Sequence, residues 1–471
     1  MSQIAFPDVP PSRAPRLDPA LLARHGRPVP RYTSYPTAPH FSPAVTADTY
    51  ATWLAQIPPG TSTSLYLHVP FCAELCLYCG CQTTVARTAA PVTAFAERLM
   101  QEIALVGQHL SQPLPVTHLH WGGGTPTLLS DTAFHAIMER LRDQFRLDDA
   151  AEIAIEIDPR VMTPEKVDTL ARAGINRASL GVQDFDLTVQ EAIGRRQSFE
   201  ETLAVATALR SAGITAINLD LIYGLPHQTL ASVERTLESA LALDADRIAV
   251  FGYAHVPWMK RHQALIPEST LPGPQARLEQ ASRMAERLNE AGYLSIGLDH
   301  FARPGDPLAH RAVAGTLKRN FQGYTTDDAP ALIGFGPSAI GALPQGYIQN
   351  CATTPAWHAA LEAGQLPISR GFALSPVDRL RRDVIERLMC DLQVDLAAVS
   401  ARHGLAPDLF ASDLPALTPL LRDGLAVRQG WKIEIPESAR AFTRTVCAVF
   451  DAYLPPAQEN AAVPRRHSAA V

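Results

Sequence analysis

Four of the seven cysteines in this 471-residue chain lie within ten residues, at Cys72, Cys76, Cys79 and Cys81. They follow directly on Ser64–Pro70, a run with the composition of a β-strand. Soft thiolates on a short loop are typical ligands of an iron-sulfur cluster. Three of them would leave one iron of a 4Fe-4S cluster open to chelate S-adenosylmethionine. An electron passed into its sulfonium would release a 5′-deoxyadenosyl radical, chemistry that the protein positions and shields.

Two other interpretations of these cysteines stay open at this level. Zinc also binds four thiolates, although its sites usually pair two short knuckles across a longer gap. A disulfide would need an oxidising compartment, which does not suit an intracellular-looking chain.

The elements that must position this loop alternate between strands and helices, which favours parallel βα units. Three predicted helix ends share an Ala-Gly pair, at Gly174, Gly213 and Gly292, where glycine suits a left-handed turn. We therefore expect an α/β fold, a partial or full (β/α) barrel with its chemistry at the C-terminal ends of the strands. The predicted strands after the first are Val116–Trp121, Glu152–Ile157, Arg177–Gly181, Ala216–Ile222 and Arg247–Phe251.

Three glycines, Gly122, Gly123 and Gly124, end the second predicted strand. Without Cβ atoms, the backbone there can approach a ligand closely and offer carbonyl acceptors to a methionyl amino group. A phosphate loop is disfavoured because no Gly-Lys-Ser/Thr follows, and a tight turn stays the plain alternative.

Polar residues recur at the ends of the later predicted strands, at Glu156, Asp158, Gln183, Asp184 and Asp220. An unsatisfied buried polar group costs about 1 to 3 kcal/mol, so such residues usually bind something. A ribose diol would suit the carboxylates. Each residue alone could instead cap a helix or bond within a loop, but their recurrence favours a lined pocket.

Composition narrows the class of protein. A hydrophobic content of 46% supports a large core plus a smaller one, and the net charge of −6 gives no general attraction to nucleic acid. No apolar run reaches the roughly 20 residues that span a bilayer, and the N-terminus lacks a signal-peptide core. We expect a cytoplasmic monomer with no membrane or nucleic-acid partner.

The domain organisation follows from changes in pattern. Residues 1–60 are rich in proline and predict an extended arm, either a lid over a planar ligand or a strap packed on the main domain. Residues 61–366 would form the barrel and its extension. Residues 367–455 predict a small helical domain, with a helix from Ser375 to about Cys390 and a winged-helix shape as one option. Residues 456–471 predict a disordered tail.

Other histidines and cysteines have plainer interpretations. His118 and His120 share one face of a predicted strand, but without a nearby carboxylate they are more typical of packed or surface groups than of metal ligands. Cys390 and Cys447 lie in apolar helical contexts and are expected in the core.

These motifs together resemble the radical S-adenosylmethionine superfamily and, more narrowly, the oxygen-independent coproporphyrinogen III oxidase (dehydrogenase) family. The resemblance runs from about Arg31 to Leu454. Its diagnostic pieces are Tyr-x-His-x-Pro-Phe before the cysteines, Gly-Gly-Gly-Thr-Pro, the Cys79-Gly80-Cys81 ending, and the segments Arg31–Thr37, Asn218–Pro226, His300–Pro304 and Arg319–Thr326.

The resemblance implies site residues one by one. Cys72, Cys76 and Cys79 would hold a 4Fe-4S cluster, and Cys81 would serve activity in a role the sequence does not reveal. A first S-adenosylmethionine would contact Tyr66, Gly123, Glu156 and Ile340. A second one would contact Tyr78, Gly124, Thr125, Gln183, Arg195, Asp220 and Ala254. Tyr78 departs from the family, which often has Phe there, but it keeps the ring.

The implied reaction is oxidative decarboxylation of two propionates of coproporphyrinogen III, which gives protoporphyrinogen IX in haem biosynthesis. External partners would donate electrons to the cluster and accept the final one. The substrate carries four carboxylates, which need cationic partners; the candidates are Arg24, Arg27, Arg31, Arg303, Lys318 and Arg319. The alternative is a haem chaperone of the same superfamily, although such relatives generally lack the Arg31–Pro36 arm and the Cys-x-Cys ending.

Overall fold

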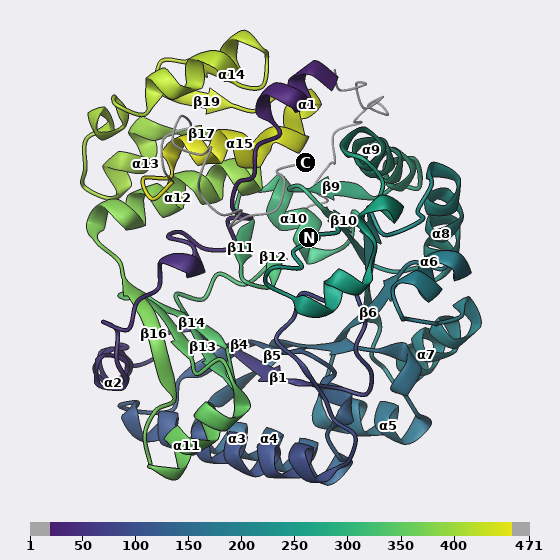
Figure 1. Cartoon of the computed structure of the whole chain (residues 1–471). Coiled ribbons are helices and arrows are strands. Elements are labelled where there is room, and N and C mark those ends of the chain that lie inside the picture. Colours follow the sequence, from purple (N-terminus) through teal and green to yellow (C-terminus); the bar gives the residue numbers. More distant parts are fainter. Residues whose placement is uncertain (1–18, 455–471) are drawn as a thin grey trace.

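Six parallel strands form the middle of the largest sheet, and each pairs with the next one along the chain (Figure 1). The computed structural model describes residues 19–454. Each strand predicted from the sequence coincides with one of these six to within a few residues; they are β1 (Thr63–Val69), β4 (Pro115–Gly123), β5 (Arg146–Ile157), β6 (Arg177–Gln183), β7 (Ala216–Tyr223) and β8 (Arg247–Gly252).

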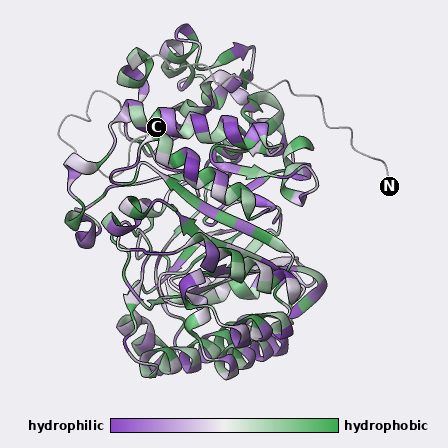
Figure 2. Ribbon diagram, turned by 90° about the vertical axis from the view of Figure 1, so that its right-hand side faces the viewer, coloured by the Kyte–Doolittle hydropathy of each residue, from purple (hydrophilic) through white to green (hydrophobic). Residues whose placement is uncertain are grey.

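Helices between these strands cover the outer face of the sheet, and Figure 2 shows both hydrophobic and hydrophilic residues along them, as expected for helices with one buried face. The predicted junction glycines have the left-handed backbone, with φ of 91° at Gly174, 90° at Gly213 and 87° at Gly292. The helices between the six strands are α3 (Ala90–His109), α4 (Asp131–Gln144), α5 (Pro164–Ala173), α6 (Leu187–Ala192), α7 (Phe199–Ser211) and α8 (Leu230–Ala242), and α9 (Pro274–Glu290) follows β8.

Additional strands extend the sheet at both edges to twelve, in the order β16-β15-β14-β13-β1-β4-β5-β6-β7-β8-β10-β9. The outermost strands, β16 and β9, do not pair with each other, so the barrel is partial. Of the added strands only β13 runs parallel to its neighbour in the central six. The added strands are β9 (Leu294–Ile296), β10 (His300–Ala302), β13 (Ala331–Phe335), β14 (Ile340–Leu343), β15 (Gly346–Asn350) and β16 (Ile368–Ala373).

Shorter elements join these strands. Two small pairs are β2 (Phe71–Cys72) with β3 (Thr84–Val85), and β11 (Lys318–Asn320) with β12 (Gly323–Thr325). The remaining helices of this part are α2 (Ala47–Ala55), α10 (Pro307–Val313) and α11 (Thr354–Glu362). Each helix of the described residues is too short or too polar to span a bilayer.

The C-terminal region has its own hydrophobic core. Its helix α12 begins after Ser375, which caps it together with Asp378, close to the predicted start. A three-stranded sheet follows in the order β17-β19-β18, compatible with the winged-helix option. The elements are α12 (Pro376–Asp391), β17 (Gln393–Asp395), α13 (Leu396–Arg402), α14 (Thr418–Arg422), β18 (Val427–Gln429), β19 (Lys432–Glu434) and α15 (Thr443–Cys447).

The described part of the N-terminal arm packs into this C-terminal core and also against the barrel sheet, where Ser42 pairs with Gly371 of β16 and the Tyr347 hydroxyl donates to Tyr35 O at 3.2 Å. Helix α1 (Pro19–His25) lies beside the C-terminal helices in Figure 1, and both Arg24 and His25 pair with Asp423. Farther along, Val29, Tyr32 and Tyr35 are buried in the C-terminal core.

These contacts refine the boundaries that the sequence suggested. Helix α2 and its buried Trp53 belong to the barrel core, although they fall within the expected arm. Strand β16 belongs to the large sheet, although it falls within the expected C-terminal domain. We therefore propose an arm that ends before α2 and a C-terminal domain that starts after β16. The predicted disordered tail lies outside the described residues.

A buried carboxylate ties the first helix of the barrel to its last strands. Glu102 of α3 is 1% exposed. It accepts hydrogen bonds from Gly336 N at 2.8 Å, Trp357 Nε1 at 3.1 Å and Asn350 Nδ2 at 2.6 Å. Burial raises the pKa of Glu102 to about 7, while these three donors work in the opposite direction. Helix α3 is thus fixed to β15, α11 and the end of β13.

Glu102→Ala should lower the free energy of unfolding by about 3 kcal/mol or more, because three donors would stay buried without an acceptor. Urea unfolding followed by circular dichroism measures the loss. Glu97→Ala, on an exposed position of the same helix, is the matched control. Equal effects of the two substitutions would contradict the role given to Glu102.

Candidate functional site

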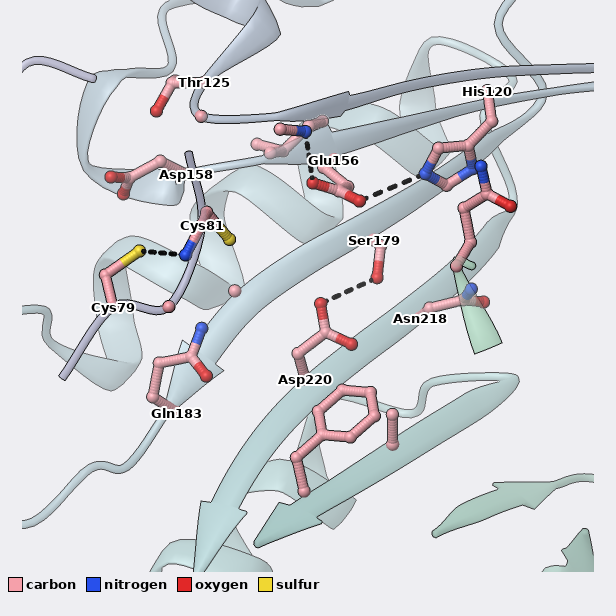
Figure 3. Close-up of a pocket in the computed structure, with 18 of the residues that line it drawn as sticks. Cys79, Cys81, His120, Thr125, Glu156, Asp158, Ser179, Gln183, Asn218 and Asp220 are labelled. Carbon is pink, nitrogen blue, oxygen red and sulfur yellow. Dashed lines mark hydrogen bonds and ion pairs between the residues drawn. The ribbon is translucent and has the colours of Figure 1, made fainter. Parts of the chain in front are cut away.

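A cavity of about 830 Å³ fills the inside of the partial barrel up to the C-terminal ends of its strands (Figure 3). It gathers most of the site residues suggested by the sequence. The lining includes Cys72, Cys76, Tyr78, Cys79, Cys81, Gly123, Gly124, Thr125, Glu156, Gln183, Arg195, Asp220 and Ala254.

Two of the residues expected to contact the first S-adenosylmethionine are not in this lining. The Tyr66 hydroxyl and His68 Nδ1 form a hydrogen bond of 3.0 Å, and the Tyr66 ring stacks on His120 with centroids 5.9 Å apart. It therefore supports a residue of the cavity wall. Ile340 lies on β14 and packs with an apolar cluster that contains Phe41 and Tyr347.

The cysteine loop follows β1 and is held by the connection between β8 and α9. Three side chains there bind carbonyl groups of the loop: Gln263 Nε2 binds Tyr78 O at 2.8 Å, His262 Nε2 binds Cys79 O at 2.8 Å, and Lys260 Nζ binds Cys81 O at 2.9 Å. Sequence reasoning missed this clamp. The only feature of the sequence that could have indicated these contacts is the polar run 260–263, which follows the last predicted parallel strand.

Cys79 and Cys81 form a pair at the end of the loop, where Cys81 N donates to Cys79 Sγ at 3.4 Å (Figure 3). A hydrogen bond between the two side chains is the main cause that lowers the pKa of Cys79 to about 6 and raises the pKa of Cys81. The lowered pKa favours the thiolate form of Cys79, which is the form that binds metals.

Two guanidinium groups lie against Cys76. Its sulfur accepts from Arg160 Nη2 and Arg195 Nη1, both at 3.7 Å. Asp158 holds both arginines, at 2.7 Å from Arg160 and 3.2 Å from Arg195. The pKa of Asp158 is lowered: its burial acts to raise the pKa, but the two cations outweigh this effect. Arg195 Nε is buried and has no hydrogen-bond partner among the described residues.

The glycine triplet is required by the packing of the protein itself. Gly123 has φ of 108°, a conformation that favours glycine. A Cβ on Gly124 would come within 2.4 Å of Phe71 O, at the start of the cysteine loop. The two motifs therefore touch, and the glycines let them approach.

Glu156 faces the cavity from the end of β5 (Figure 3). It accepts from Gly123 N at 3.1 Å and bonds to His120 Nε2 at 3.2 Å. The pKa of Glu156 is lowered: its burial acts to raise the pKa, but the contact with His120 outweighs this effect. The expectation that His118 and His120 lack a nearby carboxylate is thus wrong, because the fold brings Glu156 to His120 and Asp327 to within 3.5 Å of His118.

Asp220 and Asp184 have different environments. Asp220 accepts from Ser179 Oγ at 3.1 Å, and burial together with the charge of Glu156 raises its pKa to about 6. Asp184 does not line the cavity; it accepts from Gln228 at 2.5 Å and Thr236 at 2.9 Å. Asp184 therefore forms hydrogen bonds within the protein, the alternative considered for each of these residues, and is not part of the lined pocket.

The floor of the cavity is an ion-pair network at the other ends of the strands. Arg177 donates to Glu152 at 3.0 Å, and Arg247 donates to Asp306 at 2.8 Å. These buried charges compensate one another, so the barrel interior stays polar without an unpaired charge on its floor.

The six cationic candidates for substrate carboxylates do not lie together. Arg31 lines the cavity and donates to Gly252 O at 3.1 Å. Arg24 is paired with Asp423, Arg303 with Asp244, and Lys318 with Glu386. Neither Arg27 nor Arg319 is in the lining, although Arg319 contacts Arg31 O at 3.4 Å.

Comparison with known proteins decides the family. The radical SAM superfamily model matches residues 66–240, and the HemN C-terminal domain model matches residues 374–442. An oxygen-independent coproporphyrinogen III oxidase of Bradyrhizobium diazoefficiens is 50% identical over 92% of this chain and 96% of its own. The chain belongs to the oxygen-independent coproporphyrinogen III oxidase family. A second family member, from Pseudomonas aeruginosa, is 41% identical over 93% of this chain and 96% of its own.

A solved structure agrees with the family assignment. Coproporphyrinogen III oxidase from Escherichia coli, described as a radical SAM enzyme, matches with a TM-score of 0.87 and 39% identity over 93% of this chain and 99% of its own. The family implies a 4Fe-4S cluster and S-adenosylmethionine. The cavity fits them, because Cys72, Cys76 and Cys79 all line it, Arg195 Nε is buried without a hydrogen-bond partner among the described residues, and its volume lies near the upper end of the usual 300 to 1,000 Å³ for ligand sites.

Asp220→Asn should stabilise the cofactor-free protein at pH 8 by on the order of 2 to 3 kcal/mol. The folded-state pKa of about 6 lies above the unfolded value of 3.8, so ionised Asp220 destabilises the folded state above pH 6. The gain should shrink as the pH falls through 6 and vanish near pH 4.

Urea unfolding at several pH values measures this gain, and Asp149→Asn, at an exposed position, is the control. A gain that did not change with pH would show that charge burial at position 220 is not its source.

Proposed function

We propose that this enzyme oxidatively decarboxylates two propionates of coproporphyrinogen III to vinyl groups and gives protoporphyrinogen IX. One observation carries the proposal: the cysteine loop, the glycine triplet and the strand-end polar residues line one cavity in a chain that is 50% identical to a named oxidase over nearly its whole length. The cluster and S-adenosylmethionine, when bound, supply a radical that removes a hydrogen from the propionate side chain.

The side chains of the cavity have separate tasks in this proposal. Cys72, Cys76 and Cys79 hold the cluster, and the clamp from the β8–α9 connection keeps the loop in place. Glu156 and the Gly123 backbone orient the first S-adenosylmethionine, with Tyr66 and Ile340 as further expected contacts. A second molecule would be held by Tyr78, Gly124, Thr125, Gln183, Arg195, Asp220 and Ala254.

Water must be kept from such a site, because an alkyl radical reacts with almost any neighbouring C–H bond. Arg31 brings the N-terminal arm to the cavity wall, and its neighbours are anchored in the C-terminal core. This supports a role of the arm in closing the site over the substrate. We further infer a cytoplasmic monomer that takes electrons from an external donor, passes one to an external acceptor, and binds neither nucleic acid nor membrane.

The reconstituted protein, kept anaerobic with S-adenosylmethionine, a reductant and coproporphyrinogen III, should form the divinyl product, detected by chromatography after oxidation. A heat-inactivated sample is the control. No product alongside stable haem binding would favour the chaperone, and zinc in place of iron in the purified protein would end the radical proposal.

Cys76→Ser should lose most of the cluster iron, whereas Cys81→Ser should retain it, because three thiolates suffice for the cluster. Iron and sulfide analysis and the visible absorption of the cluster measure this difference. Cys351→Ser, at a cysteine outside the cavity, is the control. Equal iron loss in the Cys76 and Cys81 variants would contradict the division of roles.

A further inference from the structure

One guanidinium group of the cavity wall has no task in the proposed function, although it contacts a cysteine expected to hold the cluster. Arg160 lies on the 3₁₀ turn Pro159–Val161, directly after β5, and it lines the cavity. Its Nη2 donates to Cys76 Sγ at 3.7 Å, and its side chain is only 14% exposed. Water therefore competes little with this contact.

Asp158 fixes the direction of this guanidinium group. It faces the cavity directly after β5 (Figure 3) and accepts from Arg160 Nε at 3.0 Å and from Arg160 Nη2 at 2.7 Å, so the pair is bidentate. The backbone N of Arg160 also donates to Asp158, at 3.1 Å. Such a fork leaves a guanidinium little freedom. The sulfur of Cys76 thus meets a donor that is already oriented.

The groups around Cys76 share one carboxylate between two cations. Asp158 is also 3.2 Å from Arg195, whose other hydrogen-bond partners in the wall include the neutral acceptors Gly181 O and Gln197 Oε1. Asp158 and the two guanidinium groups therefore carry one net positive charge, and both guanidinium groups donate to the same sulfur.

A second carboxylate lies on the outer side of Arg160. Glu74 accepts from Arg160 Nη1 at 3.2 Å. Its side chain is 72% exposed, and water screens such exposed pairs strongly. Glu74 therefore does little to offset the positive charge that the buried groups present to Cys76.

We propose that Arg160 is a positioning residue that acts through Cys76 and raises the reduction potential of the cluster. The inference rests on the proposed function, in which Cys76 holds the cluster, and it adds how the cavity wall favours electron uptake. Reduction by the external donor adds one electron, and with it one negative charge, to the cluster and its thiolates. A fixed cation that donates to one of these sulfurs stabilises the added charge, because hydrogen bonds to the sulfurs help to set such potentials.

Arg195 makes a similar contact with Cys76 but is expected to have another task as well. It is a predicted contact of the second S-adenosylmethionine, and its Nε is buried without a hydrogen-bond partner among the described residues. In Arg160, by contrast, Nε, Nη1 and Nη2 all bind groups of the protein. Substitution of Arg160 therefore isolates the effect on the sulfur from effects on ligand binding.

The test is a redox titration of the reconstituted protein without S-adenosylmethionine, followed by electron paramagnetic resonance of the reduced cluster. Arg160→Gln should make reduction less favourable by on the order of tenfold, which for one electron is a shift of about 59 mV to a more negative potential. Arg160→Lys should fall between this variant and the unsubstituted protein, because it keeps the charge and loses the fork. Iron and sulfide content should be the same in all three proteins.

Two variants are controls and should keep the potential of the unsubstituted protein. Arg196→Gln removes the same charge at an exposed position, where Arg196 pairs with Glu191. Glu74→Gln removes only the outer partner of Arg160. An equal negative shift in Glu74→Gln and Arg160→Gln would overturn the inference, because the outer ion pair would then be the source of the effect.

An unchanged potential in Arg160→Gln with full iron content would also overturn the inference, since Arg160 would then only hold the loop. If this variant does not retain iron, Arg160→Lys decides: a potential equal to that of the unsubstituted protein overturns the inference, and a more negative one supports it. Failure of the proposed function would look different, because the unsubstituted enzyme would form no divinyl product while the order of the potentials persisted.

Discussion

The parallel pairing of six successive strands is the constraint on which the rest of the structure depends. It brings the C-terminal ends of β1, β4, β5, β6 and β7 to one rim, so residues more than 100 positions apart become neighbours. The cysteine loop, the glycine triplet and three polar side chains meet only for this reason. The same pairing buries charged groups inside the barrel, and the network of Arg177 and Arg247 with Glu152 and Asp306 compensates them at the floor.

The charges at the rim are arranged for binding more than for stability. Contact with His120 favours the ionised form of Glu156, whereas burial and the charge of Glu156 disfavour the anion of Asp220, which accepts a hydrogen bond from Ser179. Also at the rim, Arg160 and Arg195 share Asp158 and contact Cys76. A cavity with such fixed and partly unsatisfied groups is preorganised for a polar ligand and costs the empty protein some of its stability.

Local pattern predicted the elements well, because strands, helix caps and left-handed glycines depend on neighbouring residues. The parallel strands and the three junction glycines were expected close to where they lie. Long-range contacts were not predictable in this way. Nothing near His120 in the sequence indicates Glu156, and nothing near the cysteines indicates Lys260, His262 or Gln263. The core that receives Tyr32 and Tyr35 was likewise missed, since it lies over 300 residues away.

The packing of Tyr32 and Tyr35 against the C-terminal core has a consequence for the order in which the chain folds during translation. Tyr32 donates to Asp451, and Ala452 N donates to Tyr35, so the first described segment finishes its packing against almost the last. Domains emerging from the ribosome generally fold in order. The barrel can therefore assemble while translation continues, but the arm must wait for the final helices. Until residues 376–452 have left the ribosome, Val29, Tyr32 and Tyr35 of the nascent chain lack the apolar core in which they are finally buried.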